Sequence, residues 1–230
     1  MTNIHLVGGE KGGVGKSLVS RVLAQYLIDR EIPFAGFDTD RSHGALMRFY
    51  PEHASPALVN HYEALDRIIE SAVENPGRRI LVDLAAQTFD PLVKWMDDSG
   101  VVNLADEMDI HVHYWHVMDC GKDSVDLLKR LLDRFGTGLR YVLVRNQLRG
   151  NDFSLLEQSG EQTRAQELGA KIITIKKLYE GVIMKIDNGS HSFAQAKSSD
   201  EDSMGFGLMD RQRVKMWLRD AYREFDDVGI

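Results

Sequence analysis

The chain has 230 residues, 43% of them hydrophobic, and a formal net charge of -7 at pH 7. This composition is enough for one sizeable core, so we expect residues 1–230 to form a single domain. It excludes a membrane-spanning helix, because no segment approaches about 18 consecutive apolar residues. The only cysteine is Cys120, which excludes an intrachain disulfide and a cysteine-bound iron–sulfur cluster. We expect a cytoplasmic protein without a signal peptide, since the first apolar run begins within about three residues.

Short apolar runs alternate with amphipathic stretches along the chain. Strands are predicted at 4–7, 32–37, 80–84, 110–117, 141–144 and 171–175. Helices are predicted at 62–72, 124–135 and 163–168, and after the first strand, where one face carries Val19, Val22, Leu23, Tyr26 and Leu27. This alternation is typical of an α/β fold, so we expect a mostly parallel twisted sheet with helices on both faces.

Two segments near the C-terminus interrupt the alternation. Residues 187–207 are rich in Ser, Asp, Gly and His, which predicts a mobile surface connector. Residues 208–226 predict an amphipathic helix whose apolar face holds Val214, Trp217, Leu218, Ala221, Tyr222 and Phe225. Acidic and basic residues balance in this helix, whereas a membrane-surface helix has a net basic polar face. We therefore expect it to pack on the core rather than bind a membrane.

The segment most informative about function is 11–17, with the sequence K-G-G-V-G-K-S, between the first predicted strand and the first predicted helix. Backbone N–H groups of such a loop converge with the helix N-terminus into a cradle for phosphate oxygens. Lys16 is expected to lie against the β- and γ-phosphates, and the Ser17 hydroxyl to ligate Mg²⁺. The remaining predicted nucleotide-binding residues of the loop are Gly12, Gly13, Val14 and Gly15.

The loop departs from the strict phosphate-binding pattern at two positions. Glu10 stands where the first glycine belongs, and Lys11 adds a second lysine. With these features the segment resembles the deviant Walker A box of the ParA/MinD family of P-loop ATPases, K-G-G-x-G-K-[ST]. The resemblance implies a P-loop NTPase fold, binding and hydrolysis of ATP, and an ATP-bound homodimer. It assigns Lys11 to the phosphates of the partner's nucleotide.

Carboxylates follow two of the predicted strands. Ligands of open α/β sheets lie beyond the carboxyl ends of the strands, where Asp38, Asp40 and Asp83 are found. Mg²⁺ prefers oxygen ligands, and Asp83 has the form of a Walker B acid that holds the metal. The Asp38-x-Asp40 pair resembles the family's switch I motif, which implies that Asp38 lies near the metal and Asp40 orients or deprotonates the attacking water. Capping of a turn is the alternative for these two residues.

Other positions match the family only in part. In switch I, residues 41–43 (Arg-Ser-His) replace the usual Pro-Gln, and in switch II Ala85 and Gln87 replace Pro and Gly. Asn146, at the end of the fifth predicted strand, matches the family asparagine that hydrogen-bonds adenine, and its amide offers both a donor and an acceptor.

Three histidines invite a metal hypothesis. His111 and His113 share one face of a predicted strand, and His116 follows. Because no Cys, Asp or Glu box at zinc-like spacing accompanies them, we favour polar residues on a partly covered strand over a metal site.

The resemblance predicts a molecular switch, with family members acting in plasmid partition, in mobilisation during conjugation, or in cargo positioning. It implies a protein partner that stimulates slow hydrolysis. Non-specific DNA binding through phosphates is a further expectation, with Arg140, Arg145, Arg149, Lys171, Lys176, Lys177 and Lys185 as candidates. The alternatives are an ATP-dependent metabolic ligase of the same fold, which often lacks the second lysine, and a non-hydrolysing scaffold.

Overall fold

The structure is a computed structural model that describes residues 2–9, 11–40, 44–198 and 205–230. Its centre is a seven-stranded sheet in the order β3-β2-β4-β1-β5-β6-β7, in which every neighbouring pair is parallel. The strands are β1 (Thr2–Gly8), β2 (Phe34–Asp38), β3 (Ala54–Pro56), β4 (Arg79–Asp83), β5 (Ile110–Met118), β6 (Arg140–Asn146) and β7 (Lys171–Ile175).

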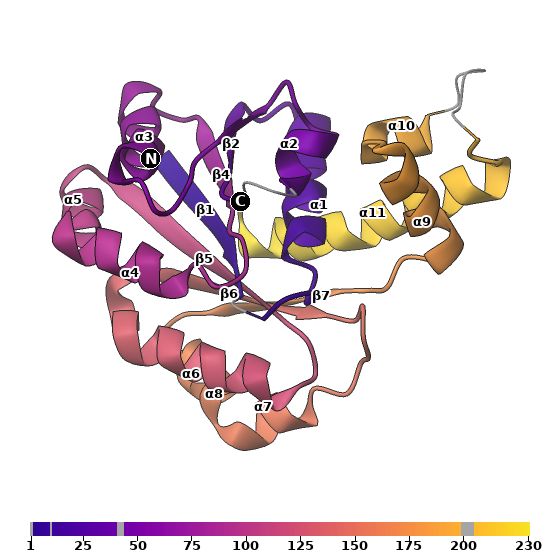
Figure 1. The fold of residues 1–230 in the computed structure, drawn as a ribbon. Coiled ribbons are helices and arrows are strands. Elements are labelled where there is room, and N and C mark those ends of the chain that lie inside the picture. The colour runs from indigo at the N-terminus through magenta and orange to yellow at the C-terminus, as the bar shows by residue number, and fades with distance from the viewer. Residues whose placement is uncertain (1, 10, 41–43, 199–204) are drawn as a thin grey trace.

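Helices cover both faces of the sheet (Figure 1). One layer contains α3 (Tyr62–Glu74), α4 (Phe89–Asp98), α5 (Val101–Glu107), α6 (Lys122–Phe135), α7 (Ser154–Ser159) and α8 (Glu161–Glu167), with a short 3-10 turn at Gly136–Gly138. The other layer contains α1 (Lys16–Asp29), α2 (Ala45–Phe49), α9 (Glu180–Gly189), α10 (Phe193–Lys197) and α11 (Leu208–Val228).

The apolar runs of the strands fill two cores because successive side chains point to opposite faces. In β4, Ile80 and Val82 belong to the core under α3–α8, whereas Leu81 belongs to the core under α1 and α11. The predicted α/β fold with a parallel sheet and helices on both faces is therefore confirmed.

The strand order determines where a ligand can lie. From β1 the chain moves to β2, β3 and β4 on one side, and then crosses β1 to add β5, β6 and β7 on the other. Such a reversal leaves a crevice at the carboxyl ends of the central strands, which is the usual ligand position in open α/β sheets. The 11–17 loop, which we call the P-loop, follows β1 at this point.

The structure adds elements that the sequence pattern missed. All six predicted strands are present, but the edge strand β3 is only three residues long and includes Pro56, so it left no periodic signal. Part of the predicted connector 187–207 is helical: α10 begins with a capping box formed by Ser192 and Gln195, and Phe193 and Ala196 are buried. Residues 199–204 of that segment lie outside the described residues.

The last helix packs along the second layer. Val214, Trp217, Leu218, Ala221 and Phe225 of α11 are buried, as the predicted apolar face requires. Trp217 also donates a hydrogen bond from Nε1 to the carbonyl of Lys176 at 2.7 Å, which ties the helix to the end of β7. Across the described ranges, no helix has the length and apolar character needed to cross a membrane.

Candidate nucleotide site

The P-loop has the conformation of a phosphate cradle. Gly13 and Gly15 adopt φ angles of +73° and +94°, which favour glycine, and Gly15 is the N-cap of α1. The loop encloses Lys16, whose side chain is buried and whose Nζ donates a hydrogen bond to the carbonyl of Lys11 at 3.2 Å. The loop and helix N-terminus thus present backbone N–H groups and a buried ammonium group in one place.

A cavity of about 280 Å³ lies beside this loop at the carboxyl end of the sheet. Seven of the predicted site residues line it: Gly12, Gly13, Gly15, Lys16, Ser17, Asp40 and Asp83. Its remaining wall is Leu18, Leu84, Ala85 and Ala86, of which the two alanines belong to the predicted switch II region. Val14 is buried beneath the loop, and neither it nor Asp38, Asn146 or Lys11 lines the cavity.

Asp83 is an electrostatically perturbed group of this cavity. Burial, and then the neighbouring charge of Asp38, raises the pKa of Asp83 to about 7, although Ser20, Ser17 and Lys16 oppose the shift. The Ser20 hydroxyl donates to Asp83 Oδ1 at 2.9 Å. A buried carboxylate held near its point of ionisation, beside the Ser17 hydroxyl, is a donor set that fits Mg²⁺.

Asp38 makes backbone contacts that a sequence pattern does not reveal. Its Oδ2 accepts hydrogen bonds from the N–H groups of Leu46 and Met47 at 2.8 and 3.2 Å, and its Oδ1 accepts one from Asp40 at 3.0 Å. Burial raises the pKa of Asp38 despite these bonds. The carboxylate therefore caps the segment that starts α2, and its role near a metal stays a prediction.

Thr39, between the two switch I aspartates, joins the ends of β2 and β4. Its N–H and its hydroxyl both donate to the carbonyl of Asp83 at 3.0 Å, and Oγ1 accepts from the N–H of Ala85 at 2.8 Å. The two switch segments are therefore hydrogen-bonded to each other. Gln87, where the family has glycine, adopts a left-handed φ of 61°. Residues 41–43 and Glu10 lie outside the described residues.

Asn146 supports the P-loop from behind. Its Nδ2 donates to the carbonyl of Val14 at 2.7 Å, and its Oδ1 accepts from the N–H of Leu148 at 3.3 Å. A Cβ on Gly15 would overlap the Asn146 amide. The side chain is buried in this arrangement, and its contact with adenine stays a prediction.

Lys11 lies in an ion pair outside the cavity. Its Nζ is 3.1 Å from Asp119 Oδ2 and 3.6 Å from Asp123 Oδ2. The hydrogen bond with Asp119 is the main reason why the pKa of Lys11 is raised. Asp119, just after β5, was missed from the sequence because nothing local to it marks a partner 108 residues away.

The histidines of β5 are packed residues. His113 Nε2 is 3.0 Å from Asn3 Oδ1, and His116 Nε2 is 3.0 Å from the carbonyl of Ser124. Burial lowers the pKa of both rings to about 4. Within the described residues there is no group of three or more His, Cys, Asp or Glu that could hold a metal ion.

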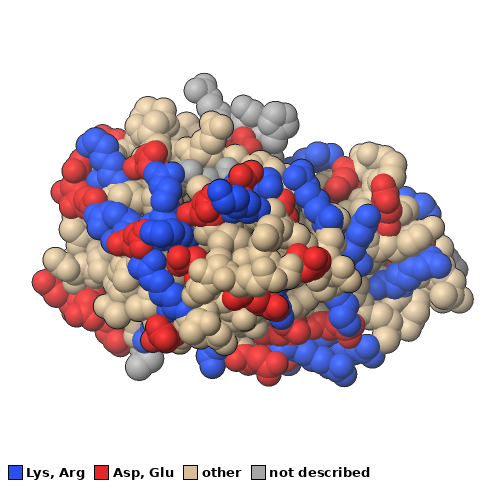
Figure 2. Space-filling model, turned by 90° about the horizontal axis from the view of Figure 1, so that it is seen from below, with Lys and Arg blue, Asp and Glu red and all other residues tan. Residues whose placement is uncertain are grey.

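The predicted DNA-binding cations do not gather on one surface. Arg140 and Lys171 begin their strands, whereas Arg145 and Lys176 lie at the opposite end of the sheet. Several pair with acids: Arg145 with Glu157, Lys176 with Asp220, Lys177 with Glu180 and Lys185 with Asp210. On the face that carries α6, α7 and α8, cations and carboxylates are interspersed (Figure 2).

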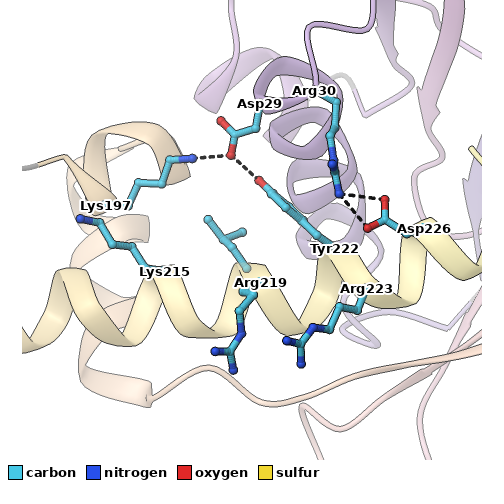
Figure 3. A pocket seen from close by; sticks show the side chains of 9 residues that line it. Asp29, Arg30, Lys197, Lys215, Arg219, Tyr222, Arg223 and Asp226 are labelled. Carbon is cyan, nitrogen blue, oxygen red and sulfur yellow. Dashed lines mark hydrogen bonds and ion pairs between the residues drawn. The ribbon is translucent and has the colours of Figure 1, made fainter.

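A larger hollow, of about 410 Å³, lies between the end of α1, α10 and α11. Its carboxylates are paired, Asp29 with Lys197 and Tyr222, and Asp226 with Arg30 (Figure 3). The cations Lys215, Arg219 and Arg223 follow one another at four-residue spacing along α11, and Arg219 pairs with Asp220. We call these three residues the α11 stripe.

Comparison with known proteins gives distant relatives. No family model matches the chain. It is 28% identical over 186 residues to protein MobD of Acidithiobacillus ferrooxidans, covering 78% of this chain and 80% of MobD. It is 23% identical to protein TraL of Escherichia coli over the full length of both. A solved structure described as a plasmid partition protein of Borrelia burgdorferi, bound to AMPPNP, is 13% identical with a TM-score of 0.48 and covers 96% of this chain and 100% of that one.

Proposed function

We propose that this chain, a ParA/MinD-like P-loop protein, is an ATP-dependent switch that binds ATP with Mg²⁺, dimerises around the nucleotide through Lys11 and hydrolyses it slowly. One observation supports this above the others: the P-loop, Asp40 and Asp83 line a single cavity at the carboxyl end of the sheet. The alternative, a metabolic ligase of the same fold, needs a pocket for a second substrate next to this cavity and often lacks the second lysine. The presence of Lys11 therefore favours the switch over the ligase.

The residues of the cavity suit phosphoryl transfer, which depends mainly on positioning and charge neutralisation. The amides of 12–17 and the start of α1 hold the phosphates, and Lys16 exchanges the Lys11 carbonyl for a phosphate oxygen. Ser17 and Asp83 hold Mg²⁺, which supplies charge neutralisation when bound. Asp40 lies in the same cavity and orients or deprotonates the attacking water.

Lys11 connects hydrolysis to assembly. Its ammonium group lies 3.1 Å from Asp119, and Lys11 does not line the chain's own cavity. In the proposed dimer it leaves Asp119 and contacts the phosphates bound by the other copy. Since hydrolysis converts ATP to ADP and removes the γ-phosphate, this contact is weakened and the dimer then separates.

The test is the molecular mass in solution with ADP and with ATP and Mg²⁺. Asp40→Ala slows hydrolysis, so the ATP-bound state should appear as a dimer, and adding Lys11→Ala should return it to a monomer. Lys122→Ala is the matched control, because Lys122 is exposed on α6 and pairs with Asp126. A mass that is the same with both nucleotides favours the ligase or the scaffold instead.

We further propose a role in plasmid partition or mobilisation, with a protein partner that accelerates hydrolysis. The family resemblance supports both. Turnover of ATP by the purified chain should therefore be slow, and should rise when the proposed protein partner is added. Fast turnover by the chain alone contradicts the need for a partner.

Non-specific DNA binding is a second candidate function, and the α11 stripe is its best surface. Four-residue spacing places successive cations about 6 Å apart along the helix, on the rim of an open hollow. Of the three, Lys215 and Arg223 have no acidic partner among the described residues. Replacing the stripe by alanine should weaken duplex binding and lower its dependence on salt. The Lys176→Ala/Lys177→Ala variant, whose lysines are both paired, should bind DNA like the parent chain.

A further inference from the structure

The loop that follows β6 lies against the outer side of the P-loop. Asn146 contacts Val14, and Leu148 and Arg149 continue along the glycines. A Cβ on Gly13 would overlap the terminal nitrogen of Arg149 and lie 3.3 Å from its Cζ. The Arg149 guanidinium therefore rests on the P-loop backbone although the side chain is 51% exposed.

Two cations lie beside the Asp119 carboxylate at this place. Asp119 Oδ2 is 3.1 Å from Lys11 Nζ and 3.8 Å from the Arg149 guanidinium. The other oxygen, Oδ1, accepts hydrogen bonds from the Ser124 hydroxyl at 2.8 Å, from the N–H of Gly121 at 3.0 Å and from Lys11 Nζ at 3.4 Å. The carboxylate is thus held in place while its cationic partners can change.

A cation beside Asp119 stabilises its buried carboxylate. Burial by itself raises the pKa of this carboxyl, but the hydrogen bonds from Ser124, Gly121 and Lys11 outweigh burial and hold the pKa below its usual range. The side chain is 7% exposed and ionised, and a buried ionised group without a partner is strongly unfavourable. Lys11 can leave at low cost only if another cation stays with Asp119.

We propose that Arg149 is a positioning residue that takes over Asp119 when Lys11 moves to the partner's nucleotide. This rests on the proposed function, in which Lys11 engages phosphates in a dimer. A shift of less than an ångström brings Arg149 to the distance that Lys11 now has, and a guanidinium can bind a carboxylate through two parallel N–H groups. Asp123, the other acid beside Lys11, is 75% exposed, so water screens it when Lys11 leaves.

The first experiment measures competition in the nucleotide-free monomer. Acetylation of Lys11 by acetic anhydride, quantified by mass spectrometry, reports how firmly Asp119 holds the lysine. Arg149→Ala should lower this reactivity about threefold or more because Lys11 then has the carboxylate to itself, and Asp119→Asn should raise it. Equal Lys11 reactivity in the parent chain and Arg149→Ala overturns the proposal, whether or not the chain dimerises.

The second experiment measures dimerisation by sedimentation velocity in ATP and Mg²⁺, with Asp40→Ala as the parent. Arg149→Ala should raise the dimer dissociation constant about tenfold, while affinity for a fluorescent ATP analogue in the monomer changes less than about twofold. Arg149→Lys should recover part of the loss. The matched control is Arg145→Ala, because Arg145 lies on the same β6 end but pairs with Glu157.

The double variant separates exchange from a structural role. Without the Asp119 carboxylate only the exposed Asp123 remains as an acid beside Lys11 among the described residues, so Asp119→Asn/Arg149→Ala should dimerise as tightly as Asp119→Asn. If Arg149→Ala weakens dimerisation equally in the chain with Asp119 and in Asp119→Asn, the exchange is overturned. Arg149 then acts by supporting the P-loop or by contacting the nucleotide. Thermal unfolding of each variant verifies that it folds. If Asp119→Asn does not fold, the recovery of dimerisation by Arg149→Lys is the test that remains. If the Asp40→Ala parent stays monomeric with ATP and Mg²⁺, the proposed function is contradicted. The acetylation of Lys11 then still shows whether Arg149 competes with Lys11 for Asp119.

Discussion

The P-loop cavity and the α11 hollow both bring cations and carboxylates together, but they do so in different surroundings. The α11 hollow is larger, about 410 Å³ against about 280 Å³. Its ion pair Arg30–Asp226 has side chains that are 47% and 45% exposed, whereas Lys16 and Asp83 are 7% and 2% exposed. Water screens the first set of charges and not the second. Burial rather than volume therefore favours the P-loop cavity as the place for the proposed phosphate chemistry, and the open hollow suits weak, salt-sensitive contacts.

The largest effect that separates the two regions is expected from Asp83→Asn. Because the pKa of Asp83 is raised to about 7, the folded chain holds this proton more tightly than the unfolded chain. The tighter binding of this proton stabilises the folded chain at low pH, and that stabilisation is lost as pH rises from about 4 to about 7. Removing the charge should raise the free energy of unfolding near pH 8 by up to about 4 kcal/mol, and by less than half of that near pH 5.

Urea unfolding at the two pH values checks this. The control is Asp226→Asn in the α11 hollow, which should change the free energy of unfolding by about 1 kcal/mol or less at both. A gain for Asp83→Asn that does not depend on pH would show that the effect comes from packing and not from a buried charge.

Nucleotide affinity should separate the regions next. Lys16→Ala removes a buried ammonium group from the phosphate cradle, so affinity for a fluorescent ATP analogue should fall by at least about 100-fold. Lys215→Ala, on the rim of the α11 hollow, should leave this affinity unchanged. Comparable losses in the two variants would contradict the assignment of the smaller cavity.

What the sequence could predict follows the range of the interactions. The P-loop depends on a strand, glycines and a helix that are adjacent in the chain, and Asp83 is marked by its place at the end of an apolar strand, so both could be proposed from the sequence, and they line one cavity. Asp119 and Arg149 meet Lys11 only through the order of β1, β5 and β6, which no local pattern encodes.

The direction in which a side chain points is harder to predict from the sequence than the element that carries it. Asn146 was placed at the end of β6, but its side chain turns to the Val14 carbonyl because the P-loop packs there. The short helix α10 was also hard to predict, because it lies in a polar segment and its helical signals are a capping box and two buried apolar residues, Phe193 and Ala196. Tertiary contacts determine both the direction of the Asn146 side chain and the formation of α10.

A smaller effect is expected from Asn146→Ala. It leaves the buried carbonyl of Val14 and the N–H of Leu148 without their partner, which should lower the free energy of unfolding by about 1–3 kcal/mol. Nucleotide affinity should fall with it, because Gly15 loses its support. Asn103→Ala, at an exposed position of α5, should change the free energy of unfolding by about 0.5 kcal/mol or less. Full stability with lost affinity would instead support a direct contact of Asn146 with the base.

The smallest effect should come from the ion pair of the open hollow. Arg30 contacts both oxygens of Asp226 at 2.9 and 2.7 Å, which is good geometry for an exposed pair. Tyr26 also donates to Asp226 Oδ1 at 2.8 Å, so the carboxylate keeps a partner when Arg30 is removed. A double-mutant cycle of Arg30→Ala and Asp226→Ala should therefore give a coupling of about 1 kcal/mol or less, which falls in high salt. A coupling above about 2 kcal/mol that persists in high salt would mean that the larger hollow shields its charges as well as the P-loop cavity does.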